Sequence, residues 1–379
     1  MSKLRVSAKA VAIPIERPTR ISTRVLSERH YLLVDVESEH GNGIGYAYAG
    51  TSGGPILAQA VDELLAPMLE REGAEDLERT WQRLYQETLL SGRRGMVVRA
   101  LSAVDTALWD LRAKACDVPL AVLLGGDVAR PLPAYASGGY YRPGEGSPAD
   151  TVTAEIEENR AEGFTDHKIK VGGLPIAEDA ERVAAAFAAM GPDDRLALDA
   201  NNAYRTPTEA IRAARAFERA ADERGIWWFE EPLSPDDITG HAEVARVLET
   251  PVATGEIHQT RWEFARLIDG RAADLLQPDA GVIGGVTEWV KVAHLADSHG
   301  IQVAPHWHAN LHAQLGAAIS NTVAIEHFSL KKDIYNFERL LTEESRLEVR
   351  GGAVHLTARP GLGIEWDQAA VDRFAISRT

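Results

Sequence analysis

The stretch HKIKVGG (167–173) begins a series of short apolar segments, each of which runs into a charged residue and then into a helix-like segment. The same pattern recurs every 20 to 31 residues, in LALDAN (196–201), WWFEEP (227–232), VATGE (252–256), LLQPDA (275–280), VAPHW (303–307) and AIEHF (324–328). A parallel strand needs a crossover of about a dozen residues or more, usually a helix, so this period favours βα units. Eight such units close a (β/α)₈ barrel, whose active site lies where the strands end. The charged residues at these ends therefore predict a site.

Three of these residues are carboxylates at successive expected strand ends, namely Asp199, Glu230 and Glu256. Neighbouring strands lie roughly 4.8 Å apart, so the three carboxylates would meet in a small volume and repel one another. A hard divalent cation relieves this repulsion, and a few oxygen ligands with open positions suit Mg²⁺. Glu231 follows Glu230 on the opposite face of a strand, so only one of the two is expected in the barrel mouth. For any one acid alone, a helix cap or an arginine pair is the alternative.

Lys168 and Lys170 lie two residues apart and therefore share one face of their expected strand. Two neighbouring ammonium groups repel, which we expect to lower the pKa of one or both toward the range of a general base. A solvated basic strand end is the alternative interpretation of this pair.

Asp279 and His306 follow two successive expected strands. An aspartate one strand before a histidine holds the imidazole in one tautomer and raises its pKa. His308 would share the face of His306, so spacing alone leaves it possible as well. Glu326 marks the last strand of the series.

The N-terminal part of the chain has a different pattern. Alternating apolar residues predict three strands within 4–50, and Asn42-Gly43 predicts a hairpin turn because both residues tolerate φ > 0. Helical periodicity follows in three segments, 54–70, 76–90 and 95–116. We expect an α+β capping domain over residues 1–130, completed by the turn-rich, strand-like tail 345–379, and a barrel domain over 131–344.

The composition excludes several classes of partner. The chain has 379 residues and a net charge of −16, which argues against nucleic acid or an anionic membrane, because both favour basic surfaces. No run of about 18 apolar residues occurs, so no membrane span is expected, and the first residues lack the apolar core of a signal peptide. Cys116 is the single cysteine, so no internal disulfide forms and a reducing, cytoplasmic compartment is expected.

These motifs together resemble the enolase superfamily and, within it, the mandelate racemase group. The similarity covers nearly the whole chain, through VDTALWDLRAKACDVPLAVLLGG, KIK, LDANNAY, WFEEP, TGE, PDAGVIGGVTEW, APHWH, IEHF and PGLGIEWD. It implies a modified TIM barrel under an α+β capping domain, with Mg²⁺ held by Asp199, Glu230 and Glu256. It also implies that loops at 16–23 and 50–54 close the site and choose the substrate, and that the protein is a homo-oligomer.

The resemblance implies a role for each remaining charged residue. Lys170 matches the base on one face of the substrate, and Lys168 the neighbour that tunes it and contacts the substrate carboxylate. His306 with Asp279 matches the dyad on the other face. Glu326 matches the group that donates a hydrogen bond to the developing enolate. The muconate-lactonising relatives would carry a lysine at position 279, so the aspartate speaks against that branch.

The expected function is that of a lyase, a Mg²⁺-dependent dehydratase of a sugar acid (an aldonate or aldarate). It would remove the proton α to the carboxylate and eliminate the β-hydroxyl to give a 2-keto-3-deoxy acid. The candidate partners of the substrate hydroxyls are Asn201, Asn202, Tyr204, His258 and His308. If no leaving group is aligned, Lys170 and His306 would exchange protons across the two faces, as in a racemase or epimerase of a 2-hydroxy acid. A non-catalytic barrel that binds a metal or a carboxylate is the third possibility, although such a barrel needs no acid/base pair.

Overall fold

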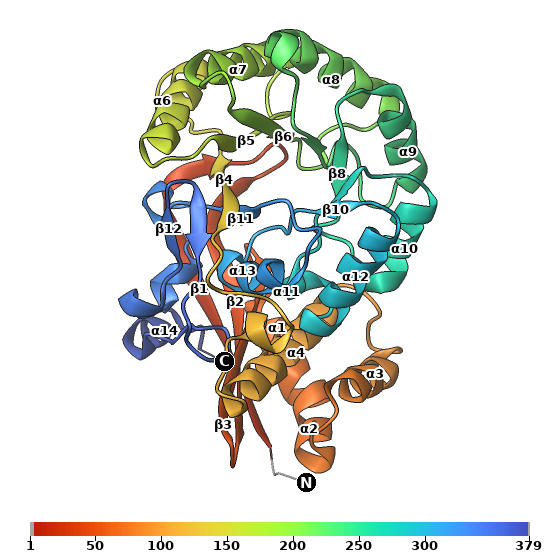
Figure 1. The fold of residues 1–379 in the computed structure, drawn as a ribbon, viewed down its shortest axis with the longest axis vertical. Coiled ribbons are helices and arrows are strands. Elements are labelled where there is room, and N and C mark those ends of the chain that lie inside the picture. Colours follow the sequence, from red (N-terminus) through yellow and green to blue (C-terminus); the bar gives the residue numbers. More distant parts are fainter. Residues whose placement is uncertain (1–3, 378–379) are drawn as a thin grey trace.

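The computed structural model describes residues 4–377, apart from the side chains of Pro18 and Asp222. It shows a barrel ringed by helices, beside a unit made of an antiparallel sheet and helices (Figure 1). Residues 1–3 and 378–379, at the two ends of the expected capping domain, lie outside the described part of the chain. Within the described part, no helix combines the length and the apolar character that a bilayer-spanning helix needs.

The cap begins with a three-stranded antiparallel sheet in the order β1-β2-β3. Its strands are β1 (Arg5–Arg20), β2 (Val25–Ser38) and β3 (Gly41–Gly50). Its helical segments are α1 (Gly54–Ala60), the π-helical turn η1 (Val61–Leu65), α2 (Ala66–Glu72), α3 (Leu77–Thr88), α4 (Met96–Ala115) and α5 (Leu120–Leu123). The prediction of three strands followed by helices is confirmed. Helix α4 packs on the sheet through its apolar face, which includes the buried Leu101, Val104 and Leu108.

The hairpin between β2 and β3 forms, but its turn differs from the expected one. The turn lies at residues 39–40, and Gly41, with a φ of 120°, begins β3, so Asn42 and Gly43 are strand residues. A Cβ on Gly43 would lie 2.1 Å from the carbonyl oxygen of Ala107 on α4. The prediction of an Asn42-Gly43 turn is therefore wrong, because this glycine allows the helix to approach the sheet rather than supplying a positive φ.

Eight parallel strands form the barrel. They are β4 (Leu132–Gly138), β5 (Asp166–Lys170), β6 (Arg195–Asp199), β7 (Phe229–Glu230), β8 (Val252–Thr254), β9 (Leu275–Leu276), β10 (Gln302–Val303) and β11 (Ile325–His327). Strand β11 pairs with β4, and a parallel bridge between Val303 and Thr322 joins β10 to the chain before β11, so the sheet closes. The expected barrel is confirmed.

The barrel helices follow the strands in turn. They are α6 (Pro148–Ala161), α7 (Ile176–Ala189), α8 (Pro207–Ala221), α9 (Ile238–Val247), α10 (Thr260–Asp269), α11 (Ala280–Ile283), α12 (Val286–Ser298) and α13 (Ala309–Ala318). Short 3₁₀ turns complete the chain around them: η2 (Asp222–Arg224), η3 (Leu330–Lys332), η4 (Phe337–Leu340) and η5 (Glu343–Ser345). In the described chain β11 is followed by 3₁₀ turns instead of an α-helix, which makes this a modified (β/α) barrel.

The C-terminal tail is shared between the two units. The hairpin of β12 (Glu348–Arg350) and β13 (Ala353–His355) pairs with β4 of the barrel. The chain then returns to the cap, where the backbone N–H of Leu362 donates to Asp110 at 2.6 Å and helix α14 (Gln368–Phe374) contacts β1. The tail therefore links the barrel to the cap.

The segment 16–23 lies against the loop that follows β5. The Oγ of Ser22 donates to the carbonyl of Val171 at 2.5 Å, and Arg20 donates to the carbonyl of Gly173 at 2.7 Å. These contacts hold this part of the cap over the ends of the barrel strands, where the charged residues lie.

Candidate active site

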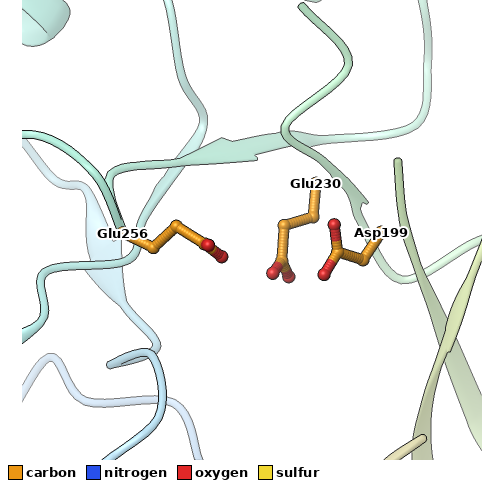
Figure 2. A group of neighbouring side chains, drawn as sticks. All are labelled: Asp199, Glu230 and Glu256. Carbon is orange, nitrogen blue, oxygen red and sulfur yellow. The ribbon is translucent and has the colours of Figure 1, made fainter. Parts of the chain in front are cut away.

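The three strand-end carboxylates lie together at the ends of β6, β7 and β8. Asp199 and Glu230 are the last residues of their strands and pair in register, and Glu256 lies two residues beyond β8. One oxygen of each lies within 4.8 Å of the others, and Figure 2 shows the three side chains directed into a common space. Trp228 Nε1 and Gln277 Nε2 donate to Oε2 of Glu230 at 2.9 and 2.6 Å, which holds that carboxylate in place.

Two buried lysines on β5 contact this cluster. Lys168 Nζ lies 2.6 Å from Oε1 of Glu230 and 2.8 Å from Oε1 of Glu326. Lys170, the last residue of β5, contacts Asp199 and lies over the ring of Tyr140. The alternation of the strand thus directs both ammonium groups toward the acids.

The pKa of both lysines is raised, not lowered. Burial opposes the charged form of Lys168, but Glu230 and Glu326 outweigh burial and raise its pKa well above the usual value. Burial likewise opposes the charged form of Lys170, and Asp199 outweighs it. The expectation of a pKa lowered by mutual repulsion is therefore wrong for this arrangement. Carboxylates within ion-pair distance act on each lysine more strongly than the other lysine does.

His306 and Asp279 form a hydrogen-bonded pair on another side of the cluster. His306 Nδ1 lies 3.0 Å from Oδ2 of Asp279, and its Nε2 lies 3.5 Å from Oε2 of Glu256. Asp279 is fixed in turn by the backbone N–H of Gly281 at 2.7 Å. Burial lowers the pKa of His306, but Glu256 and Asp279 outweigh it and raise this pKa to about 9. The expected rise in the pKa of this histidine is confirmed.

Glu326 on β11 accepts a hydrogen bond and forms an ion pair. Its Oε2 accepts a hydrogen bond from the backbone N–H of Trp307 at 2.6 Å, and its Oε1 faces Lys168. Burial acts to raise the pKa of Glu326, but Lys168 and His306 outweigh it and lower this pKa. The carboxylate is therefore an acceptor in this arrangement. Donating a hydrogen bond, as the resemblance implies, requires a proton that the ion pair with Lys168 disfavours.

His308 does not share the face of His306. The φ angle is 63° at Trp307 and 21° at His308, so the chain leaves strand geometry after β10. His308 is fully buried, and its Nε2 accepts a hydrogen bond from the backbone N–H of Tyr48 in the cap at 3.3 Å. Burial lowers the pKa of His308 to about 3. It joins the cap to the barrel, and the spacing alone could not separate it from His306.

Glu231 lies one residue beyond the end of β7. Strand β7 ends at Glu230, and Glu231 has a φ of 43°, so strict alternation no longer applies. Burial, and next the carboxylates of Glu256 and Asp199, raise the pKa of Glu231 well above its usual value. Glu231 is therefore a further buried acid near the cluster. Only Glu230 joins Asp199 and Glu256 in the group of acids whose oxygens lie within 4.8 Å of one another, so the expectation that one of the two adjacent glutamates lies in the barrel mouth stays a prediction.

The other polar candidates have mostly structural partners. Asn201 donates to Asp199 from its backbone N–H at 2.8 Å and from its amide at 3.2 Å. Asn202 donates to the carbonyl of Leu233, and a ring nitrogen of His258 lies 3.0 Å from the carbonyl oxygen of Pro235. The buried hydroxyl of Tyr204 has no hydrogen-bond partner among the described residues.

The donor set of the cluster fits Mg²⁺. All three side chains are carboxylates, the oxygen ligands that hard cations prefer. Burial raises the pKa of Glu230 to about 8 even with Lys168 beside it, so the cluster holds its full negative charge poorly without a cation. Oε2 of Glu256 is buried without a hydrogen-bond partner in the described part of the chain. Asp199, Glu230 and Glu256 are therefore the candidate ligands.

Comparison with known proteins gives matches to both units of the fold. Residues 3–125 match the mandelate racemase / muconate lactonizing enzyme N-terminal domain, and residues 151–370 match the family described as enolase C-terminal domain-like. The chain is 34% identical to the L-talarate/galactarate dehydratase of Salmonella typhimurium, over 97% of this chain and 89% of the relative. It is 35% identical to the arabinonate dehydratase of Saccharolobus solfataricus, over 90% of each chain.

A solved structure is similar over nearly its full length. The L-talarate dehydratase from Polaromonas sp., complexed with Mg and L-glucarate, has a TM-score of 0.88 and 32% identity, and the match covers 99% of this chain and 97% of that one. The resemblance expected from the sequence motifs is confirmed. This chain belongs to the mandelate racemase / muconate lactonizing enzyme family of the enolase superfamily.

Proposed function

We propose that this protein is a Mg²⁺-dependent dehydratase of a sugar acid, a hydro-lyase that yields a 2-keto-3-deoxy acid. The observation that carries the proposal is that Lys170 and His306 contact the same carboxylate cluster, through Asp199 and Glu256 respectively. A barrel that only binds metal needs the acids but not an amine and an imidazole beside them. The relatives that dehydrate talarate, galactarate or arabinonate, and the relative that holds Mg and L-glucarate, support the same chemistry.

In this proposal Asp199, Glu230 and Glu256 hold the metal ion. When bound, Mg²⁺ supplies positive charge that acidifies the hydrogen α to the substrate carboxylate. Lys168 directs its ammonium group toward that carboxylate. Lys170 removes the α-proton at its Nζ, for which it must be neutral. Its ion pair with Asp199 favours the charged form, so Lys170 becomes a base only when Asp199 has another partner.

His306 has the properties of the general acid. Its raised pKa keeps the imidazolium form at neutral pH, and Asp279 accepts the Nδ1 hydrogen bond, which leaves Nε2 directed toward the cluster. The Nε2 proton passes to the β-hydroxyl as the carbon–oxygen bond breaks, so water leaves. The electron pair left by the α-proton forms the enol, which becomes the keto acid by tautomerisation.

The test is incubation with a panel of aldonic and aldaric acids and Mg²⁺, with keto acid measured as its semicarbazone. Keto acid from at least one substrate supports the dehydratase. Exchange of the α-proton in D₂O without any keto acid would instead indicate racemisation or epimerisation by Lys170 and His306. If neither reaction occurs with any acid of the panel, the proposal fails and a binding protein is indicated.

We also propose a cytoplasmic location and a homo-oligomeric state. The location is supported by Cys116, which has no second cysteine to pair with and is exposed. The oligomer is supported only by the resemblance to the family. Light scattering coupled to size-exclusion chromatography tests it, and a monomer would contradict it.

A further inference from the structure

Arg99 on α4 is a charged residue near the cluster that the proposed mechanism does not use. Its guanidinium donates to the backbone carbonyl of Tyr48 at 2.9 Å, just before the segment 50–54. It lines a cavity of about 180 Å³ together with His258, which lies two residues beyond Glu256. The packing of α4 therefore places a guanidinium within electrostatic reach of Glu256, one of the candidate metal ligands, and close to a loop that the family resemblance assigns to substrate choice.

In the part of the chain that the structure describes, no acid lies within ion-pair distance of the Arg99 guanidinium. Among the described residues, Tyr48 is its one hydrogen-bond acceptor, so Nε and Nη2 remain without a protein acceptor. Asp279 and Glu256 act on Arg99 only from farther away, and burial, the largest effect, lowers its pKa. Arg99 is partly exposed and lines the cavity, so its spare donors are open to a ligand there, and a guanidinium binds an anion through charge-assisted hydrogen bonds. These donors point to a ligand that carries negative charge.

Two other arginines can be compared with Arg99 by whether they have an acidic partner. Arg94 lines the same cavity, but it forms an ion pair with Asp236 at 3.1 Å and another with Glu263. Arg24, exposed just after the segment 16–23, lies near enough to Arg99 to lower its pKa further. In the described part of the chain neither Arg24 nor Arg99 has an acidic partner. Two positive charges of the cap that have no acidic partner among the described residues favour an anion as their ligand.

We propose that Arg99, assisted by Arg24, binds the second carboxylate of a dicarboxylic sugar acid, so that the preferred substrate is an aldarate rather than an aldonate. This rests on the proposed function, because the first carboxylate must lie at the metal ion and Lys168. A planar guanidinium binds a carboxylate through two parallel hydrogen bonds, and Arg99 has the spare donors for them. An aldonate ends in a hydroxymethyl group, which leaves both arginines unpaired.

The test measures binding rather than turnover. Titration calorimetry on the Lys170→Ala holoprotein with Mg²⁺ compares galactarate with galactonate, glucarate with gluconate, and talarate with talonate. We expect the diacid to bind more tightly in at least one pair. On this background, Arg99→Gln keeps a donor for Tyr48 but removes the charge, and it should weaken diacid binding by about 10- to 100-fold. Binding of the matched monoacid should change less than about threefold.

Two further variants separate a substrate contact from support of the fold. Arg94→Gln removes the same charge from the same cavity, and it should preserve the preference for the diacid because Arg94 is already paired. Arg24→Gln should weaken the diacid by only about two- to fivefold, because exposed charges are screened. The proposal is overturned if no pair shows a preference, if Arg99→Gln weakens both acids equally, or if Arg94→Gln abolishes the preference as well. Keto acid formation by the unmodified protein is scored separately, so a failed dehydratase assay and a failed diacid preference are distinguishable.

Discussion

His306→Asn is expected to stop dehydration while leaving exchange of the α-proton by Lys170 in place. The asparagine amide can still donate to Asp279, so the hydrogen bond that His306 Nδ1 makes at 3.0 Å has a replacement. The side chain has lost the proton that His306 would pass to the leaving hydroxyl. Lys170, which reaches the cluster through Asp199, is untouched by the change.

The size of the effect follows from the protonation state of His306. A pKa raised above the usual 6.5 favours the protonated imidazole at pH 7, so the acid form is the main form of His306. General acid catalysis contributes about 10²- to 10⁴-fold to a rate. We therefore expect kcat for keto acid to fall about 10²- to 10⁴-fold, which corresponds to about 3–5 kcal/mol of transition-state stabilisation.

Two assays on one sample measure the effect. Semicarbazone absorbance follows the keto acid, and proton NMR in D₂O follows loss of the α-proton signal. The matched control is Lys170→Ala, which should lose both signals if Lys170 alone removes the proton that initiates dehydration. If His306→Asn loses exchange to the same extent as keto acid, or retains keto acid within about threefold, the assignment of base and acid is wrong.

Three further expectations concern pH, metal and packing. The raised pKa of His306 keeps its acid form present through the usual 6.5, so dehydration should fall only as pH rises above that value. A fall near pH 6.5 in the rate profile would contradict this. Mg²⁺ at about 100 times its Kd should raise the free energy of unfolding by about 2.7 kcal/mol, which thermal melting detects as a higher melting temperature. Asp199→Asn should lose most of this increase in melting temperature. Gly45→Ala places a Cβ 2.0 Å from the carbonyl oxygen of Ala103. The free energy of unfolding measured in urea should therefore fall by about 1–3 kcal/mol or more. Unchanged stability would mean that α4 does not approach the sheet so closely.

The barrel and the identity of its strand-end residues could be predicted because both depend on local sequence. A parallel strand and its returning helix occupy a nearly constant length of chain, so the period of apolar segments from 167 to 328 already indicates the fold. The residue that ends each strand must then lie on the same rim. This is why Asp199, Glu230 and Glu256 could be chosen before their distances were known.

The directions of the side chains and their charge states were decided by the tertiary structure. His308 follows the predicted site residue His306, but positive φ angles at Trp307 and His308 take the chain out of strand geometry, so His308 lies under the cap. The pKa of Lys168 and of Lys170 is raised because acids on other strands of the barrel contact them, which the spacing of two lysines could not indicate.

The surroundings of Arg99 also could not be predicted from the sequence, because the residues near it are distant along the chain. The helix that carries it precedes Glu256 by more than a hundred residues, and only the packing of the cap on the barrel brings the two into one region. Sequence alone therefore determined the strands, their order and the chemistry at their ends, because these are set by neighbours along the chain. The directions of the side chains, their ionisation and the arginines around the substrate depend on groups that meet only in the folded protein, where burial and short distances govern the electrostatics.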